Sequence, residues 1–406
     1  MNFFHHIQKL RSIWMCGLIC LLSGFVLAAP IKIPFRYVQS FILIELKVNS
    51  KIPVQLIFDT GAEHHILFDR IYTDLFENIY TRQVKVIGSD FQQELNALIT
   101  KPLTNVIPAF GELTFPWLVL EDANQALSEW VGENVQGILS ANCFSNYILE
   151  IDYRRQQIIL HEKLPKKINK SYTVCSNSIQ KNKPYIQTMV QSTSSVKPIP
   201  MELLLDTGAG VPLLIYAYEK DILTMPQPLI PGYLGSGLGG KINGLVGRID
   251  QFQFCNQSQT LVPTYFHIID SIQLSLDPSQ KKGIIGNQIL EKYSIFLDYR
   301  NQKLYLKLKS TKNKIIQFDR SGILVVSGGP MLKNYYVSMV IPGSPAEEAG
   351  IEIGDEIVSL KGLGKSFLSL HYIQKILSSK KLDKVKIKLL RNNVKIKRNI
   401  RLRELI

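Results

Sequence analysis

Two stretches of the chain are nearly the same: Leu56-Ile57-Phe58-Asp59-Thr60-Gly61-Ala62 and Leu203-Leu204-Leu205-Asp206-Thr207-Gly208-Ala209. Each is an apolar run that ends in Asp-Thr-Gly-Ala, and the two copies begin 147 residues apart. This separation fits two similar halves of one chain rather than one small unit. Related halves would each contribute one carboxylate to a shared site, so the pattern indicates an acid–base pair of aspartates.

A second pair of segments repeats with almost the same spacing. Residues 137–139 read Gly-Ile-Leu and residues 283–285 read Gly-Ile-Ile, an offset of 146 residues. Asp152-Tyr153-Arg154 and Asp298-Tyr299-Arg300 have that same offset. Repeated segments that recur at almost one spacing predict an internal duplication.

Strand signals precede both aspartates. Apolar and aromatic residues dominate 41–48 and 54–58 in the first half, and 185–191 and 201–205 in the second. Polar and proline-containing turn residues separate the members of each pair, so each pair predicts a hairpin that runs into its aspartate. We therefore predict a mostly β fold with an internally duplicated, two-lobed domain.

The N-terminus has the features of an export signal. Lys9 and Arg11 precede an apolar stretch at 13–27, and Ala28 and Ala29 offer a cleavage site. A secretory signal peptide over residues 1–29 is the prediction, with an uncleaved membrane anchor as the alternative. The protein is then expected to be exported, to the periplasm or outside the cell.

The cysteine content and the charge restrict the classes of protein to which the chain can belong. Outside the predicted signal lie Cys143, Cys175 and Cys255, which permits one disulfide but not a disulfide-built scaffold. The formal net charge is +14, and much of the excess lies at 380–403, where basic and apolar residues alternate. Such alternation predicts strands with a solvated basic face. We expect no nucleic-acid binding and at most a weak association with an anionic envelope.

The repeated motif has a chemical rationale. The glycine of each copy permits close approach of two loops, and the threonine hydroxyl can bond to the opposite loop. Two carboxyl groups held close together cannot both ionise, so one pKa rises and the pair titrates as a unit; aspartic proteases are the standard example. The candidate catalytic residues are Asp59 and Asp206. The candidate loop residues are Thr60, Gly61, Ala62, Thr207, Gly208 and Ala209.

On these motifs, residues 31 to about 310 resemble the retropepsin-like aspartic proteases in a single-chain form that carries both lobes. The resemblance implies an acid-protease-like β-barrel fold, an extended peptide in a cleft between the lobes, and flaps that cover it. It also implies that residues 137–139 and 283–285 cross behind the active-site loops. The first half departs from the pattern because it lacks a glycine-rich flap. The flap candidates are Ile87, Gly88, Gly237, Leu238, Gly239 and Gly240.

The last part of the chain resembles a PDZ domain of the kind associated with bacterial proteases. Pro342-Gly343-Ser344-Pro345-Ala346, followed by Gly354-Asp355-Glu356-Ile357, carries this resemblance. It implies a small α+β domain that binds a peptide or a protein terminus as an added strand. Gly328 and Gly329 are the candidate binding residues. The alternative is a domain that only docks on the two lobes.

Other sites are not indicated. His64 and His65 lie next to the first aspartate loop, but neighbouring strand residues point to opposite faces and no third ligand is near, so neither a metal nor a cofactor is expected. A monomer is expected because one chain supplies both aspartates. The predicted organisation is a signal peptide, two lobes and a PDZ domain, at residues 1–29, 30–168, 169–310 and 311–406.

The predicted function is that of a bacterial, exported aspartic endopeptidase, which hydrolyses peptides or unfolded proteins with a water activated by Asp59 and Asp206. The alternative is a catalytically silent peptide-binding protein of the envelope, which uses the cleft and the PDZ domain for capture. A third possibility is a surface adhesin that uses the basic face.

Overall fold

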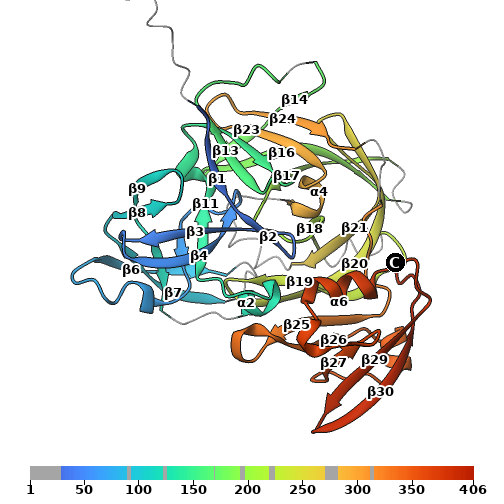
Figure 1. Cartoon of the computed structure of the whole chain (residues 1–406). Coiled ribbons are helices and arrows are strands. Elements are labelled where there is room, and N and C mark those ends of the chain that lie inside the picture. Colours follow the sequence, from blue (N-terminus) through green and yellow to red (C-terminus); the bar gives the residue numbers. More distant parts are fainter. Residues whose placement is uncertain are drawn as a thin grey trace, which may run out of the picture.

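A computed structural model gives the fold of the chain (Figure 1). It describes residues 29–88, 93–121, 126–168, 170–192, 197–218, 225–269, 282–310 and 315–406. Residues 1–28 of the predicted signal peptide lie outside the described residues. With 53% strand and 10% helix, the protein is mostly β, as the sequence predicted.

The first half (30–168) contains a large sheet in which the Asp59 strand is central. The spatial order is β6-β7-β10-β5-β11-β4-β3-β8-β9, and β2 pairs with β3. The strands are β2 (Arg36–Val38), β3 (Phe41–Val48), β4 (Ile52–Asp59), β5 (Ile66–Leu67), β6 (Tyr80–Ile87), β7 (Glu94–Thr100), β8 (Leu103–Ile107), β9 (Gly111–Phe115), β10 (Leu118–Leu120) and β11 (Gly137–Ser140).

The second half (170–310) repeats this arrangement around Asp206. Its sheet has the order β15-β16-β17-β22-β18-β21-β20-β19. The strands are β15 (Ser178–Gln180), β16 (Lys183–Gln191), β17 (Ile199–Leu205), β18 (Leu213–Ala217), β19 (Ile230–Gly237), β20 (Gly240–Phe254), β21 (Gln257–Ile268) and β22 (Gly283–Ile285). The hairpins β3–β4 and β16–β17 both form where the sequence predicted them.

A third sheet joins the two halves. Its order is β1-β13-β12-β23-β24-β14, with antiparallel pairing of β12 and β23 at its centre. The repeated Asp-Tyr-Arg segments therefore begin at the last residues of two neighbouring strands, Asp152 of β12 and Asp298 of β23. The strands are β1 (Ile31–Pro34), β12 (Ile148–Asp152), β13 (Gln157–His161), β14 (Thr173–Ser176), β23 (Tyr293–Asp298) and β24 (Lys303–Leu308).

The C-terminal domain (315–406) has its own sheet and its own core. The order is β25-β26-β27-β29-β30, with β28 paired to β27, so β25 is an edge strand. Buried aliphatic side chains, including Val337, Ile357 and Ile373, form the core. The strands are β25 (Ile323–Gly328), β26 (Asn334–Val340), β27 (Glu356–Leu360), β28 (Leu363–Gly364), β29 (Lys384–Arg391) and β30 (Val394–Arg401), and the helices are α5 (Pro345–Glu348) and α6 (Leu370–Leu377).

Helices in the two halves are short. Among the described residues they are α2 (Ala126–Val131) and α4 (Asn287–Leu290), with 3₁₀ turns at η1 (Arg70–Tyr72) and η2 (Ala141–Phe144). The C-terminal domain has 3₁₀ turns at η4 (Pro330–Leu332) and η5 (Lys365–Phe367). None of the described helices is both long and apolar enough to cross a membrane.

Several contacts tie the parts together. One buried cluster contains residues of both halves, such as Phe58 and Leu205. Cys175 and Cys255 form a disulfide, which is the pairing that the cysteine count left open. Arg248 on β20 donates to the carbonyls of Ile316, at 3.2 Å, and Ile406, at 3.3 Å, and so links the second half to both ends of the C-terminal domain. In Figure 1 this domain lies beside α2 and β19.

Candidate active site

The two aspartates occupy equivalent places in the two halves. Asp59 is the last residue of β4, and Asp206 directly follows β17. In each half a short strand runs parallel to the aspartate strand: β11 beside β4, and β22 beside β17. Both short strands begin with glycine for a steric reason. A Cβ would lie 2.0 Å from the Ile66 carbonyl oxygen at Gly137 and 2.2 Å from that of Leu214 at Gly283.

The two loops are joined by reciprocal hydrogen bonds of their threonines. The Thr60 amide donates to Thr207 Oγ1, and the Thr207 amide donates to Thr60 Oγ1, each at 3.0 Å. Thr60 Oγ1 donates to the Leu205 carbonyl at 2.6 Å, and Thr207 Oγ1 donates to the Phe58 carbonyl at 2.9 Å. Both threonines are buried. This network fixes one aspartate strand against the other.

The two carboxyl groups face each other between the loops. A Cβ on Gly61 would lie 2.6 Å from Asp206 Cγ, and a Cβ on Gly208 would lie 2.4 Å from Asp59 Cγ. Only glycine leaves room for these carboxyl groups at the two positions. The Gly61 amide donates to Asp59 Oδ1 at 2.5 Å, and the Gly208 amide donates to Asp206 Oδ1 at 2.7 Å. Each carboxyl group is thus held by its own loop.

The surroundings favour one shared proton. Burial, the charge of Asp206 and a hydrogen bond with Asp206 raise the pKa of Asp59 well above its ordinary value. The amides of Gly61 and Ala62 oppose this rise, because they stabilise the ionised form. Both aspartates are buried, with 9% of each residue exposed. A close carboxyl pair of this kind can both accept and donate a proton.

Three polar residues that sequence reasoning missed support the loops. Ser140 Oγ donates to the Ala62 carbonyl at 2.6 Å, and Asn142 Nδ2 donates to the Glu63 carbonyl at 3.0 Å. In the second half, Asn287 Nδ2 donates to the Thr207 carbonyl at 2.6 Å. All three follow the repeated Gly-Ile-Leu or Gly-Ile-Ile segment, and that position in the repeat was the signal available in the sequence.

The residues after Asp59 turn away from the pair. Glu63 lies 3.8 Å from His64 and 3.9 Å from Lys181, at the surface. His65 is buried against Phe115, with ring centroids 3.9 Å apart. Burial and the neighbouring His64 lower the pKa of His65 to about 3. Among the described residues, no three His, Cys, Asp or Glu side chains are placed to hold a metal.

The flap candidates lie in two hairpins. Ile87 ends β6, which pairs with β7, and Gly88 follows it; residues 89–92 lie outside the described residues. In the second half, β19 ends at Gly237 and β20 begins at Gly240, with Leu238 and Gly239 between them. Leu238 packs on a buried cluster of the first half. This hairpin therefore reaches across to the other half.

In the C-terminal domain the structure places the two predicted glycines at one end of β25. Gly328 ends this strand, and Gly329 begins the turn toward β26 with φ +68°. A cavity of about 230 Å³ is lined instead by Ile323, Leu324 and Val325, further toward the start of β25. The sequence did not single out these residues, because an apolar strand looks the same whether it faces a core or a groove.

Comparison with known families gives a partial identification. Residues 336–391, from β26 to β29, match the family model of the PDZ domain. The C-terminal domain is therefore PDZ-like, and this suggests binding of peptide termini. No match was found among curated proteins.

Proposed function

We propose that the protein is an aspartic endopeptidase of the acid-protease kind, with Asp59 and Asp206 as its catalytic pair. The observation that carries this proposal is the meeting of two carboxyl groups across matched loops that are locked by reciprocal threonine bonds. The duplicated halves and the sheet that joins them support an acid-protease-like fold.

In the proposed reaction the pair holds one proton. The ionised carboxylate removes a proton from a water molecule, which attacks the carbonyl carbon of the scissile peptide bond. The protonated carboxyl group donates a hydrogen bond to the carbonyl oxygen as negative charge develops on it. Collapse of the tetrahedral intermediate breaks the C–N bond, and the leaving amine takes up a proton. The β19–β20 hairpin would cover the bound peptide.

The test is cleavage of an unfolded protein by the purified chain over a range of pH, with Asp59→Asn and Asp206→Asn as variants. Both variants keep the side-chain volume but cannot carry the shared proton, so each is expected to lower kcat by at least about a thousandfold. Thermal unfolding of the variants checks that they remain folded. Wild-type protein without turnover at any pH would refute the catalytic proposal.

A second candidate function is peptide capture without catalysis, and the PDZ match is the observation that favours it. Both candidates would bind the peptide at the aspartate pair and use the same PDZ-like domain. They differ in one measurement: on the enzyme proposal, Asp206→Asn keeps peptide binding and loses cleavage, whereas on the capture proposal the wild type binds and releases peptides intact.

We further propose that the protein is exported. The basic and apolar N-terminus supports this, and so does the disulfide between Cys175 and Cys255, because disulfides persist in oxidising compartments. Cell fractionation followed by N-terminal sequencing tests the proposal. A mature N-terminus near residue 30 in the exported fraction is expected, and full-length protein confined to the cytoplasm would contradict it.

A further inference from the structure

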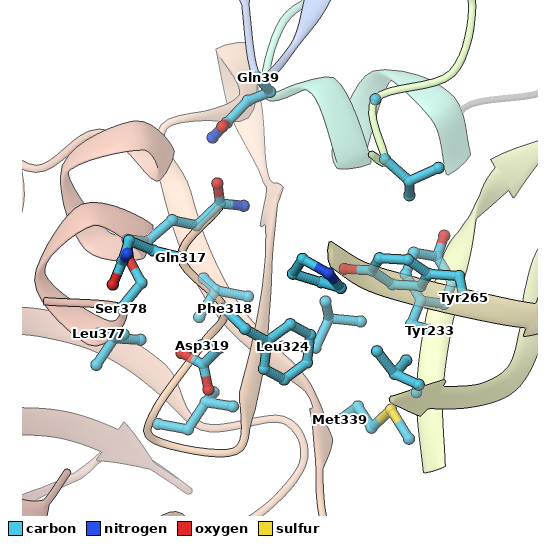
Figure 2. Close-up of a pocket in the computed structure, with 18 of the residues that line it drawn as sticks. Gln39, Tyr233, Tyr265, Gln317, Phe318, Asp319, Leu324, Met339, Leu377 and Ser378 are labelled. Carbon is cyan, nitrogen blue, oxygen red and sulfur yellow. The ribbon is translucent and has the colours of Figure 1, made fainter. Parts of the chain in front are cut away.

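The cavity of the C-terminal domain opens toward the second half. One wall consists of β25 and α6, and the other contains Tyr233 and Tyr265 of the second half (Figure 2). Asp319 also lines the cavity, at the point where the chain enters β25. Since β25 is the edge strand of its sheet and lies beside α6, this is where an added peptide strand would pair.

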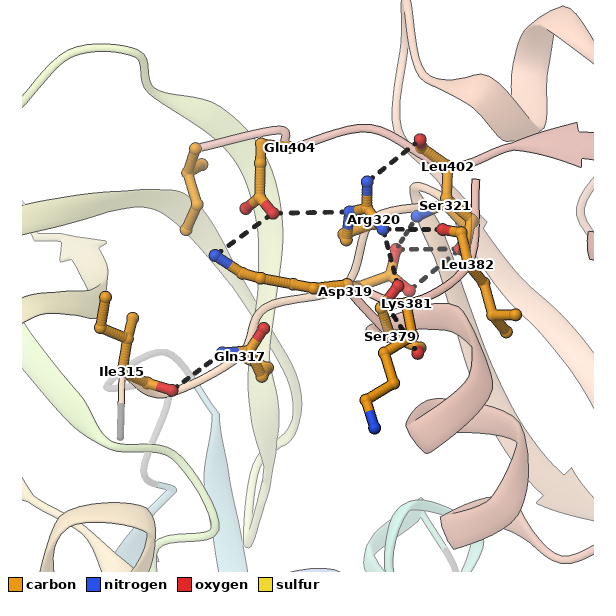
Figure 3. Close-up of polar contacts among 12 residues, drawn as sticks. Ile315, Gln317, Asp319, Arg320, Ser321, Ser379, Lys381, Leu382, Leu402 and Glu404 are labelled. Atoms are coloured by element: carbon orange, nitrogen blue, oxygen red, sulfur yellow. Dashed lines mark hydrogen bonds and ion pairs between the residues drawn. The ribbon is translucent and has the colours of Figure 1, made fainter. Parts of the chain in front are cut away.

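Two backbone amides of the loop directly before this edge strand are already bound. Asp319 Oδ1 accepts from the Ser321 amide at 2.9 Å and from the Gly322 amide at 2.5 Å (Figure 3). The Ser321 hydroxyl donates to both oxygens of the same carboxylate, at 2.9 and 3.0 Å. Gly322 has φ +81°, and a Cβ there would lie 2.2 Å from Ser344 Cβ, so the loop needs glycine at this position.

In PDZ domains, a peptide joins the sheet edge as a strand and backbone amides hold its terminal carboxylate. The amides of Ser321 and Gly322 directly precede β25, and the carboxylate that they hold lines the cavity beside this strand. Here they hold the carboxylate of Asp319. Burial raises the pKa of Asp319 to about 6, and the amides of Gly322 and Ser321 oppose the rise because they bind the ionised form. The side chain is therefore a carboxylate above this pKa.

The next residue fixes this loop in place. The Arg320 guanidinium donates to the carbonyls of Ser379, at 2.6 Å, and Leu382, at 2.9 Å, which follow α6. Its Nε lies 3.4 Å from Glu404 (Figure 3). Arg320 thus ties the loop that carries Asp319 to the segment after α6 and to the C-terminal residues.

The far end of the groove is also covered by the chain itself. A Cβ on Gly132, directly after α2, would lie 3.1 Å from Ser327 Oγ on β25 and 3.4 Å from Leu370 Cδ2 on α6. Trp130, within α2, contacts Tyr233 with ring centroids 4.7 Å apart, and both residues line the cavity. The first half therefore packs against the end of the groove that lies opposite Asp319.

We propose that Asp319 is a built-in ligand of the PDZ-like domain: its carboxylate occupies the position of a peptide terminus, so the groove of the full chain does not select free C-termini. This proposal rests on the peptide-binding role of the PDZ-like domain and is independent of catalysis by the aspartate pair.

The test compares two pools of short peptides randomised near their C-terminus, identical except that one pool ends in a free carboxylate and the other in a carboxamide. Enrichment of each pool on the full-length protein is measured at neutral pH by mass spectrometry. All proteins carry Asp206→Asn to prevent cleavage. The variants are Asp319→Ala, which frees the amides, and Asp319→Asn, which keeps an oxygen acceptor for them.

With Asp319 present, we expect equal enrichment of the two pools, or none. Asp319→Ala is expected to enrich the free-carboxylate pool about tenfold over the carboxamide pool, and Asp319→Asn much less. If the protein that keeps Asp319 enriched the free-carboxylate pool about tenfold over the carboxamide pool, the proposal would be overturned. This part of the experiment requires no variant of Asp319. If Asp319→Ala bound both pools equally, the Asp319 proposal would be overturned, and the peptide-binding role of the domain would stand. If Asp319→Ala bound neither pool, both the Asp319 proposal and the peptide-binding role would be refuted.

Discussion

The hydroxyl of Thr207 can be removed without a change of shape by Thr207→Val. The side chain is fully buried, donates to the Phe58 carbonyl and accepts from the Thr60 amide. The variant loses both hydrogen bonds, so the buried Phe58 carbonyl and Thr60 amide lose this partner. Each lost bond of this kind costs about 1–2 kcal/mol, so the free energy of unfolding should fall by about 2–4 kcal/mol.

Urea unfolding followed by tryptophan fluorescence measures this loss, because Trp117 is buried in the first half. The matched control is Thr207→Ser, which keeps the hydroxyl and should lose less than about 1 kcal/mol. Thr60→Val removes the equivalent bonds, and the double variant should cost less than the two single losses together because the bonds form one network. A Thr207→Val protein within about 0.5 kcal/mol of the Thr207→Ser protein would refute the assigned role of the network.

Three further predictions concern pH and cross-links. Because the pKa of Asp59 is raised in the folded state, the folded state binds a proton that the unfolded state has lost. This contribution to stability is full below pH 3.8 and declines as the pH rises through the pKa of the folded state. Melting temperatures measured over a range of pH should show this decline for the wild type and a flatter curve for Asp59→Asn. Cys255→Ser opens a link to Cys175 that spans 80 residues, and it should destabilise the protein by about 4 kcal/mol, whereas an unchanged urea midpoint would contradict the link. Arg391→Ala leaves the buried Asp355 carboxylate without its two bonds, at 2.7 and 2.8 Å, and should destabilise the C-terminal domain by about 3 kcal/mol near neutral pH. The pKa of Asp355 is lowered, despite opposing desolvation, by Arg391 among others, so this loss should shrink as the pH falls below 3.8, and a pH-independent loss would count against the ion pair.

Features that depend on short segments could be predicted from the sequence. Alternating apolar residues and turn residues predicted the β3–β4 and β16–β17 hairpins, because strand period and turn chemistry are local properties. The repeat spacing predicted equivalent places for Asp59 and Asp206. The glycine-proline pattern after β26 predicted a PDZ-like domain, and the family match at 336–391 confirms it.

Features that depend on contacts between distant segments were decided by the tertiary structure alone. The sequence could not pair Cys175 with Cys255, because three cysteines leave the pairing open. The only sequence signal for Ser140, Asn142 and Asn287 was their position after the repeated segments, and only the fold shows which loop carbonyls they bind.

The binding groove of the C-terminal domain shows the same division. The resemblance to a PDZ domain made Gly328 and Gly329 the candidates for binding a terminus, and in the fold they lie at the far end of β25 from the amides that Asp319 holds. An edge strand becomes a groove only when a helix packs beside it, and here α6 lies more than forty residues further along the chain. Local chemistry therefore determined the strands and the reactive side chains, and long-range packing determined which of them meet.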